Sequence, residues 1–185
     1  NCSNNYGPYQ FPEKLIPLML VNALEGKGLP IYGDGSNVRD WLFVDDHCAA
    51  ISAIIDSGII GETYNVGGNT EIVNLDLVTI LCEELDKKFE SDKTLAAQFP
   101  LSAPAKGKES KSLIYYVKDR LGHDVRYAIN ASKIFNDLDF TPKVNFAEGL
   151  SLTLEWYLDN EHWWRSISSD DHQAWLNKHY GQTSN

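Results

Sequence analysis

The fold of this chain is decided by one stretch, residues 29–46, which reads LPIYGDGSNVRDWLFVDD. Apolar Leu29 and Ile31 lead into a Gly-Asp-Gly triplet, whose glycines permit the positive φ of a tight turn. An apolar run follows and ends on Asp45 and Asp46, either of which can cap a helix. The stretch therefore predicts a hairpin of two strands joined by a tight turn, followed by the start of a helix.

Arg39 is the unusual residue of this stretch, because its guanidinium falls on a predicted strand among apolar residues. Such a group extends its charge into solvent, pairs with a carboxylate such as Asp40, or faces a cleft in which it binds an anion bidentately. The spacing leaves the structural pairing and the anion site open as alternatives.

The composition sets the class of protein. A chain of 185 residues with 43% apolar residues can bury a sizeable core, and its length suggests one domain or one large lobe. No apolar run reaches the roughly 18 residues that span a bilayer, and no signal peptide opens the chain. We therefore expect a cytoplasmic protein with no membrane partner. The net charge of −10 argues against a nucleic-acid partner, which requires a clustered basic face.

Cysteine usage and the first residue add two expectations. Cys2, Cys48 and Cys82 are widely spaced and form no CxxC pair, so we expect reduced thiols and neither a zinc site nor a disulfide framework. The chain opens with Asn1, and its only methionine is Met19. We therefore expect that translation begins upstream of this sequence.

Apolar periodicity and turn residues predict helices interleaved with short strands, an α/β class with too few strands for a complete doubly wound sheet. Residues 1–10 read as a loop carrying Tyr6 and Tyr9. Residues 86–112 read as a long surface insertion, rich in lysine and interrupted by prolines. The expected helices run from Glu13 or Pro17 to Gly26, from Asp45 or Asp46 to about Gly58, and over 75–85 (capped by Asn74), 131–138 and 146–158. The expected strands are 63–66, 72–73 and 113–117, and a tail helix capped by Asp170 or Asp171 closes the chain, with Trp163, Trp164 and Trp175 packing the tail down.

Local signatures of catalysis are missing from the sequence. It contains no GxGxxG, no phosphate-binding P-loop, and no HExxH or GxSxG motif, and its histidines lack metal-ligand spacing. The charged loop 118–126 follows a predicted strand, which is a common place for ligand contacts. The residues alone thus indicate an α/β lobe with one or two arginines that can contact an anion.

Four runs carry a family resemblance. They are NNYGPYQFPEKLIP at 4–17, YGDG at 32–35 with RDW at 39–41, GETYNVGG at 61–68, and DRLGHD at 119–124. They closely resemble the dTDP-glucose 4,6-dehydratases, and the resemblance covers nearly the whole chain except 86–112. It implies the C-terminal, substrate-binding lobe of an extended short-chain dehydrogenase/reductase, with only the last piece of the Rossmann domain present.

The resemblance also implies site residues. Asn5 matches a contact to NAD, and Arg39 matches the arginine that binds the substrate diphosphate. Asn4, Lys14, Leu15 and Asn74 match substrate contacts, Pro30, Ile31 and Tyr32 match the wall around the nucleoside, and Asp119, Arg120, Leu121, Gly122 and His123 match a loop that closes over the nucleotide. Leu121 departs from the family, in which proline is usual, and this predicts a less rigid loop.

The catalytic residues of the family are missing from this chain. Its tyrosine-lysine pair, its acid/base set and its glycine-rich phosphate loop all belong upstream of Asn1. The resemblance therefore predicts no catalytic residue here and an inactive chain by itself, with activity, as an NAD-dependent lyase acting on a dTDP-sugar, belonging to a longer, homodimeric parent protein. Two alternatives stay open, namely a non-catalytic sugar-nucleotide binding module and part of a related UDP-sugar epimerase or decarboxylase.

The resemblance divides the chain into one incomplete unit of three segments. Residues 1–28 are expected to be the tail of the nucleotide-binding lobe with its crossover helix. Residues 29–160 are expected to be the substrate-binding lobe, with the insertion 86–112. Residues 161–185 are expected to be a C-terminal tail helix.

Overall fold

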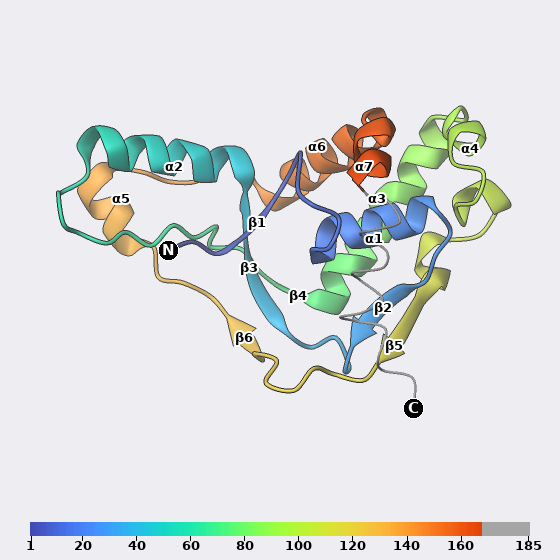
Figure 1. The fold of residues 1–185 in the computed structure, drawn as a ribbon, viewed down its shortest axis with the longest axis horizontal. Helices are drawn as coiled ribbons and strands as arrows, with labels where there is room; N and C mark the ends of the chain where they lie inside the picture. Colours follow the sequence, from blue (N-terminus) through green and yellow to red (C-terminus); the bar gives the residue numbers. More distant parts are fainter. Residues whose placement is uncertain (168–185) are drawn as a thin grey trace.

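The computed structural model describes residues 1–167, which form an α/β fold of two parts (Figure 1). An arm carries α2 (Val44–Ser57) and α5 (Ser132–Leu138), and a larger body carries the other helices. These are α1 (Leu15–Leu24), α3 (Asn74–Ser91), α4 (Leu95–Gln98), α6 (Phe146–Asp159) and α7 (Glu161–Ile167), with the short 3-10 helices η1 (Pro104–Lys106) and η2 (Ser110–Leu113). The strands are β1 (Asn4–Tyr6), β2 (Leu29–Tyr32), β3 (Val38–Phe43), β4 (Glu71–Val73), β5 (Ile114–Val117) and β6 (Arg126–Tyr127).

Strand β3 is the centre of the larger sheet. It pairs in parallel with β1 and β6 and antiparallel with β4, whereas β2 and β5 form a separate parallel pair. The tight turn between β2 and β3 is confirmed, since Gly33 and Gly35 have φ values of 59° and 78°. The predicted hairpin is wrong, because the two strands that flank this turn lie in different sheets. Turn residues specify that the chain reverses, and distant strands then supply the hydrogen-bonding partners.

Two apolar cores lie on the two sides of β3. The larger core holds α1, α3, α6 and the β2–β5 pair, and α1 contributes residues at helical spacing. The smaller core lies under α2 and α5 in the arm. Side chains alternate along β3, so Trp41 and Phe43 belong to the larger core and Leu42 to the smaller one. The buried residues of the smaller core are Leu42, Ala50, Tyr64, Val66 and Ile134.

Helix starts differ in detail from the prediction. Helix α1 begins at Leu15, so Pro17 falls in its first turn, where a missing N–H costs little. Helix α2 begins at Val44, and neither Asp45 nor Asp46 caps it. Instead, the buried Asp46 carboxylate accepts hydrogen bonds from the main-chain N–H groups of residues 143 and 144, at 3.0 and 2.9 Å. A long-range contact therefore uses the carboxylate that local sequence assigned to a cap.

Three further local predictions are corrected. Residues 63–66 form no strand, since only an isolated bridge joins Val66 to Cys2. Tyr6 lies in β1 and is buried, so it does not belong to a loop. Asn74 is the first residue of α3 and does not cap it, and this helix continues to Ser91. The predicted strand at 72–73 and the helices at 131–138 and 146–158 are confirmed within a residue or two.

Residues 86–112 are packed against the body rather than forming a surface loop. The segment contains the end of α3, then α4, η1 and η2 (Figure 1). Phe89, Leu95 and Phe99 are buried in the larger core. At its end, the Asp86 carboxylate accepts hydrogen bonds from the main-chain N–H and the hydroxyl of Ser110. A few widely spaced apolar residues thus anchor a segment whose composition is polar.

The tryptophans of α7 pack as predicted. Trp164 is fully buried, its indole N–H donates to the main-chain oxygen of Tyr157 at 2.9 Å, and its ring stacks on Phe99. Trp163 packs against the ring of Trp156. The predicted tail helix at Asp170 or Asp171, and Trp175, lie outside the described residues.

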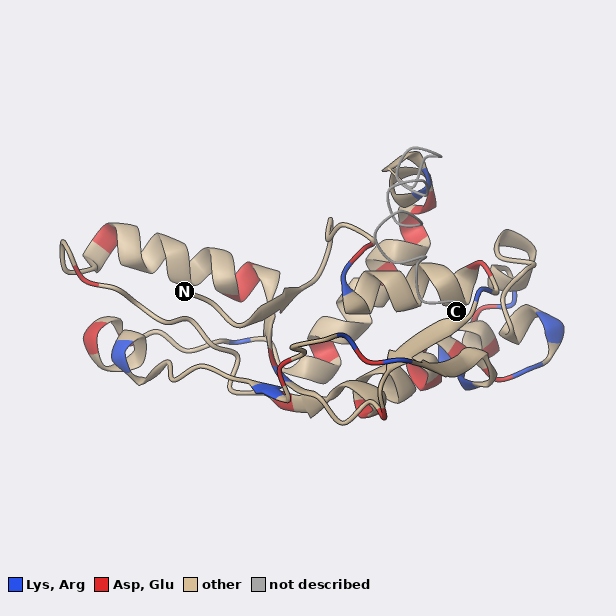
Figure 2. Cartoon of the chain, turned by 60° about the horizontal axis from the view of Figure 1, so that its bottom comes forward, with Lys and Arg blue, Asp and Glu red and all other residues tan. Residues whose placement is uncertain are grey.

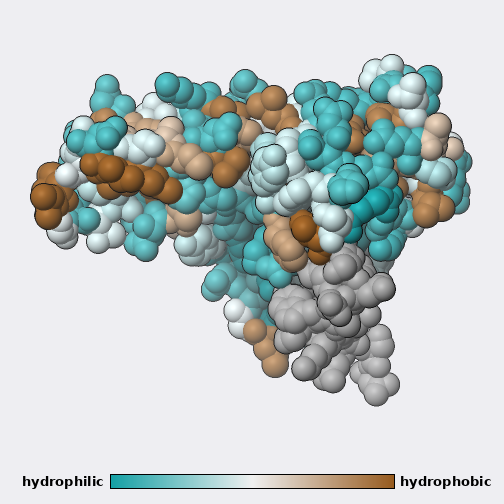
Figure 3. All heavy atoms as spheres, turned by 45° about the horizontal axis from the view of Figure 1, so that its top comes forward, coloured by the Kyte–Doolittle hydropathy of each residue, from teal (hydrophilic) through white to brown (hydrophobic). Residues whose placement is uncertain are grey.

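One face of α2 has no covering element among residues 1–167. Ile51 and Ile55 are exposed on this helix, and the loop after it exposes Ile59 and Ile60. Figure 3 shows the corresponding apolar atoms gathered on the arm. No helix in the described part of the chain is long and apolar enough to cross a bilayer.

Candidate functional site

The loop after β5 gathers charged residues against Tyr32 at the end of β2 (Figure 2). The guanidinium carbon of Arg120 lies 5.1 Å from the centre of the Tyr32 ring, and the His123 ring meets the same tyrosine edge-on at 6.2 Å. The Asp119 carboxylate accepts a hydrogen bond from Nδ1 of His123 at 2.7 Å. This bond holds the pKa of the Asp119 carboxyl below its usual range. The loop is therefore folded over Tyr32 by aromatic and charge-assisted contacts.

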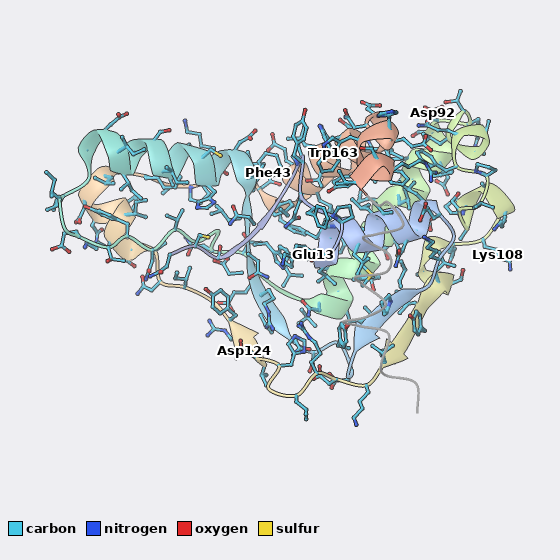
Figure 4. All side chains as sticks on the ribbon, in the orientation of Figure 1. Glu13, Phe43, Asp92, Lys108, Asp124 and Trp163 are labelled. Atoms are coloured by element: carbon cyan, nitrogen blue, oxygen red, sulfur yellow. The ribbon has the colours of Figure 1, made fainter. Side chains whose placement is uncertain are left out.

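Arg39 projects from β3 toward this loop. Its guanidinium donates to the main-chain oxygens of Val38, at 2.7 Å, and Asp124, at 2.8 Å. Figure 4 labels Asp124 on the loop between β5 and β6. No carboxylate of residues 1–167 lies within ion-pair distance of Arg39, which excludes pairing with Asp40, one of the two alternatives that the spacing left open. Arg39 thus has no anionic partner in the described part of the chain.

Asp40 has a different role. Its side chain is 1% exposed and accepts hydrogen bonds from the main-chain N–H groups of Gly68, at 3.0 Å, and Thr70, at 2.7 Å. Because a β-strand alternates its side chains, Asp40 points to the opposite face of β3 from Arg39. The Asp40 carboxylate therefore stabilises the turn at Gly68 that precedes β4, and it does not pair with Arg39.

The strand register places other predicted residues near Arg39. Asn4 of β1 is opposite Trp41 of β3, and this pairing puts Asn4 on the Arg39 face of the sheet. Asn74 follows β4, and its main-chain N–H donates to the main-chain oxygen of Asn37 at 2.9 Å. The Asn74 side-chain oxygen is buried and has no hydrogen-bond partner in the described residues. Asn4 and Asn74 therefore lie on the same side of the sheet as Arg39, and the side-chain oxygen of Asn74 can still accept a hydrogen bond.

Asn5 also has an available acceptor. Its side-chain nitrogen donates to the main-chain oxygen of Ser3 at 3.0 Å, while its side-chain oxygen is buried without a partner among residues 1–167. Buried polar atoms are nearly always hydrogen-bonded in folded proteins. An unpaired acceptor at Asn5 is what a hydroxyl or amide of a bound cofactor could satisfy.

The remaining predicted residues differ in exposure. Lys14 is exposed and pairs with Glu13 at 2.8 Å, and Leu15 is half-buried at the start of α1. Pro30 is half-buried, whereas Ile31 is 2% exposed and packs in the larger core. The wall around a nucleoside that these residues are expected to form stays a prediction. Leu121 and Gly122 are exposed at the tip of the loop, where Gly122 has a φ of 73°.

Two surface hollows in the described residues lie away from this cluster. One is lined by residues of α5 and its flanking loops, including Asn69, Asn130 and Phe135. The other lies between α1, α4 and α7 and includes Glu25 and Arg165. Neither hollow includes Tyr32, Arg39 or His123. No group of three or more acidic, cysteine or histidine side chains suited to a metal ion occurs among residues 1–167.

Sequence reasoning missed the backbone groups that hold the cluster together. The Asp124 main-chain oxygen accepts both from Arg39 and from the Asn37 side chain, at 2.8 and 3.1 Å. Every residue has a main-chain carbonyl, so the sequence does not show which carbonyl accepts such a hydrogen bond. The buried Asn37, directly before β3, was the one residue whose type could have indicated this contact.

A family model described as GDP-mannose 4,6-dehydratase matches residues 1–153. A dTDP-glucose 4,6-dehydratase from Neisseria meningitidis is 50% identical over 167 residues, which are 90% of this chain and 44% of the relative. The solved dTDP-glucose 4,6-dehydratase of Bacillus anthracis, in complex with NAD, is 51% identical with a TM-score of 0.74, covering 90% of this chain and 46% of that one. The enzyme of the same name from Streptomyces venezuelae is 42% identical with a TM-score of 0.75, covering 90% and 45%.

The similarity extends over both parts of the fold, because residues 1–153 include β1, the arm and the loop around His123. The chain spans a little under half the length of the relatives that it matches. Its fold corresponds to the C-terminal portion of the extended short-chain dehydrogenases/reductases. From its sequence and its fold together, the chain belongs to the family described as GDP-mannose 4,6-dehydratase.

Proposed function

We propose that this chain is the substrate-binding portion of an NAD-dependent dTDP-glucose 4,6-dehydratase, which converts dTDP-glucose to dTDP-4-keto-6-deoxyglucose and water. Support comes from the solved relatives of that name, which are 42% and 51% identical over 90% of this chain. The proposal places the activity in a longer polypeptide that also supplies a nucleotide-binding lobe.

One observation carries the proposal, namely the unpaired positive charge of Arg39 beside the Arg120 loop. The Arg39 guanidinium is oriented by two neutral carbonyls, and it retains N–H donors for a further acceptor. Arg120 approaches from the neighbouring loop and stacks on Tyr32. Two guanidinium groups in an otherwise acidic protein suit the paired phosphates of a sugar nucleotide.

The other predicted residues take supporting roles in the proposal. Pro30, Ile31 and Tyr32 form the wall around the nucleoside, and Tyr32 supplies its aromatic ring. Lys14 and Leu15 contact the substrate near its pyrophosphate and sugar, and Asn4 and Asn74 are further substrate contacts. Asp119, Arg120, Leu121, Gly122 and His123 close over the nucleotide. The open side-chain oxygen of Asn74 fits a hydroxyl donor of the substrate.

NAD, when bound, accepts a hydride from the sugar and later returns it. In this chain Asn5 is the residue proposed to hold the cofactor, through the side-chain oxygen that lacks a partner. The nicotinamide chemistry needs further residues that this sequence does not contain, so we propose that the 185-residue chain by itself catalyses nothing. The partners proposed for the longer protein are a dTDP-sugar and a second copy of itself, with no nucleic acid and no membrane.

The domain division is part of the same proposal. Residues 1–28 would complete the nucleotide-binding lobe, residues 29–160 would form the substrate lobe, and residues 161–185 the tail. The burial of Phe89, Leu95 and Phe99 in the larger core supports including residues 86–112 in the body of the substrate lobe.

The test compares two polypeptides. The longer protein and the 185-residue chain are each incubated with NAD and dTDP-glucose, and with UDP-glucose as a second substrate. We expect the longer protein to convert dTDP-glucose to a product lighter by one water, detected by mass spectrometry, and the short chain to yield none. Conversion of UDP-glucose to an epimer, or a longer protein that binds dTDP-glucose without dehydrating it, would contradict the proposal.

A further inference from the structure

The turn between β1 and α1 connects two groups of proposed site residues. Asn4 and Asn5 stand before it, and Lys14 and Leu15 stand after it. Figure 4 labels Glu13 near the start of α1, on the side from which this turn arrives. The relative position of the two groups therefore depends on how this turn is held.

Gln10 lies within this turn and forms a hydrogen bond that spans it. Its side-chain nitrogen donates to the main-chain oxygen of Asn5 at 2.8 Å. This bond fixes the strand end that carries Asn5 to the middle of the turn. Gln10 and Asn5 each also retain a buried side-chain oxygen without a partner among residues 1–167.

Side chains of α6 and α7 pack against the same turn. The hydroxyl of the fully buried Tyr157 donates to the main-chain oxygen of Gln10. The ring of Tyr9, which has a φ of 60°, lies 4.6 Å from the ring of Trp156 and 5.5 Å from that of Trp163. A non-glycine residue with a left-handed backbone costs energy, and it persists only where the surrounding structure enforces it. The body of the protein thus determines the path of the turn.

We propose that Gln10, anchored by Tyr157, is a positioning residue that sets the geometry between Asn5, which is proposed to hold NAD, and Lys14, which is proposed to contact the sugar nucleotide. Gln10 acts through the main chain of Asn5, to which its side-chain nitrogen donates. The inference rests on the proposed function.

Loss of a positioning residue changes substrate binding and turnover, whereas loss of a purely structural residue changes mainly stability. Loss of the Gln10 amide leaves the Asn5 carbonyl without its partner and lets the strand end shift relative to α1. Shifts of about 1 Å at positioning residues reduce turnover by as much as about a hundredfold in enzymes. Binding and turnover should therefore respond well beyond the effect on stability.

The experiment uses the longer protein that contains this chain, with Gln10→Leu and Tyr157→Phe as variants. Gln98→Leu is the matched control, because the Gln98 side chain also donates to a main-chain oxygen of α6, that of Leu158, at 3.1 Å, but lies away from the turn. For each protein, the KM for dTDP-glucose, kcat and the thermal midpoint are measured.

We expect Gln10→Leu and Tyr157→Phe to raise the KM or lower kcat by about tenfold, in line with one lost hydrogen bond that positions substrate. Gln98→Leu should keep both constants within about twofold of wild type at a similar thermal midpoint. An active wild type whose Gln10→Leu and Gln98→Leu variants are alike overturns this inference alone. An inactive wild type overturns the proposed function and this inference with it.

Discussion

The Arg39 guanidinium donates to the main-chain oxygen of Asp124 at 2.8 Å, across 85 residues of sequence. The bond joins the central strand β3 to the loop that carries Arg120 and His123. Because the acceptor is a neutral carbonyl, the bond orients the arginine without neutralising it. The strand and the loop are thereby held together with a positive charge between them.

Replacing Arg39 with lysine keeps the charge but removes the planar fork of donors. We expect the Kd of the longer protein for dTDP, measured by titration calorimetry, to rise about tenfold or more, since lysine cannot bind phosphate bidentately. Arg165→Lys is the control, because Arg165 pairs with Glu25 and Glu161 away from the loop, and its Kd should stay near wild type. Equal affinities in the two variants would refute the role of Arg39.

Replacing Asp40 with asparagine should destabilise the fold. The carboxylate accepts from the N–H groups of both Gly68 and Thr70, and an amide can present its oxygen to only one of them. We expect the free energy of unfolding, from urea denaturation of the 185-residue chain, to fall by about 3 kcal/mol. Asp45→Asn, at an exposed position in the first turn of α2, should change it by about 0.5 kcal/mol or less.

Truncating Phe99 tests whether residues 86–112 belong to the core. Phe99 is 1% exposed and stacks on Trp164, so Phe99→Ala should lower the free energy of unfolding by about 3–5 kcal/mol. Leu101→Ala removes an exposed side chain from the same segment and should cost about 0.5 kcal/mol or less. A similar small effect from both variants would mean that the segment is a surface loop after all.

Acid should loosen the loop over Tyr32. The hydrogen bond from His123 lowers the pKa of Asp119 in the folded protein below its unfolded value, which is near 3.9. The contact is therefore fully present above about pH 4 and is lost as the pH falls through the lowered folded pKa. NMR chemical shifts of His123 and Tyr32 should report this transition, and Asp119→Asn should abolish it. An unchanged transition in the variant would assign it to another group.

Much of the secondary structure could be predicted because it is specified locally. Helical spacing identified α1, and the glycines at 33 and 35 identified the turn that follows β2. The pairing partners of the strands could not be predicted, since β2 pairs with a strand that lies more than 80 residues away along the chain. Residues 86–112 were misread because average polarity hides a few deeply buried side chains, of which Phe99 is the clearest.

The candidate site was predicted through the family resemblance rather than through periodicity or spacing. Spacing left two options for Arg39, and the structure excluded Asp40 as its partner because the two side chains point to opposite faces of β3. The Tyr32–His123 contact joins segments that only the fold brings together. Main-chain acceptors such as Asp124 are set by the path of the backbone, which residue types encode only indirectly.

Strand β3 supplies Trp41 and Phe43 to one core and Leu42 to the other. The smaller core has too few buried side chains to be stable without the larger core. Because β3 runs through both cores, the arm cannot unfold while the body stays folded. The arm and the body should accordingly melt together in one cooperative step, because both cores contain side chains of β3.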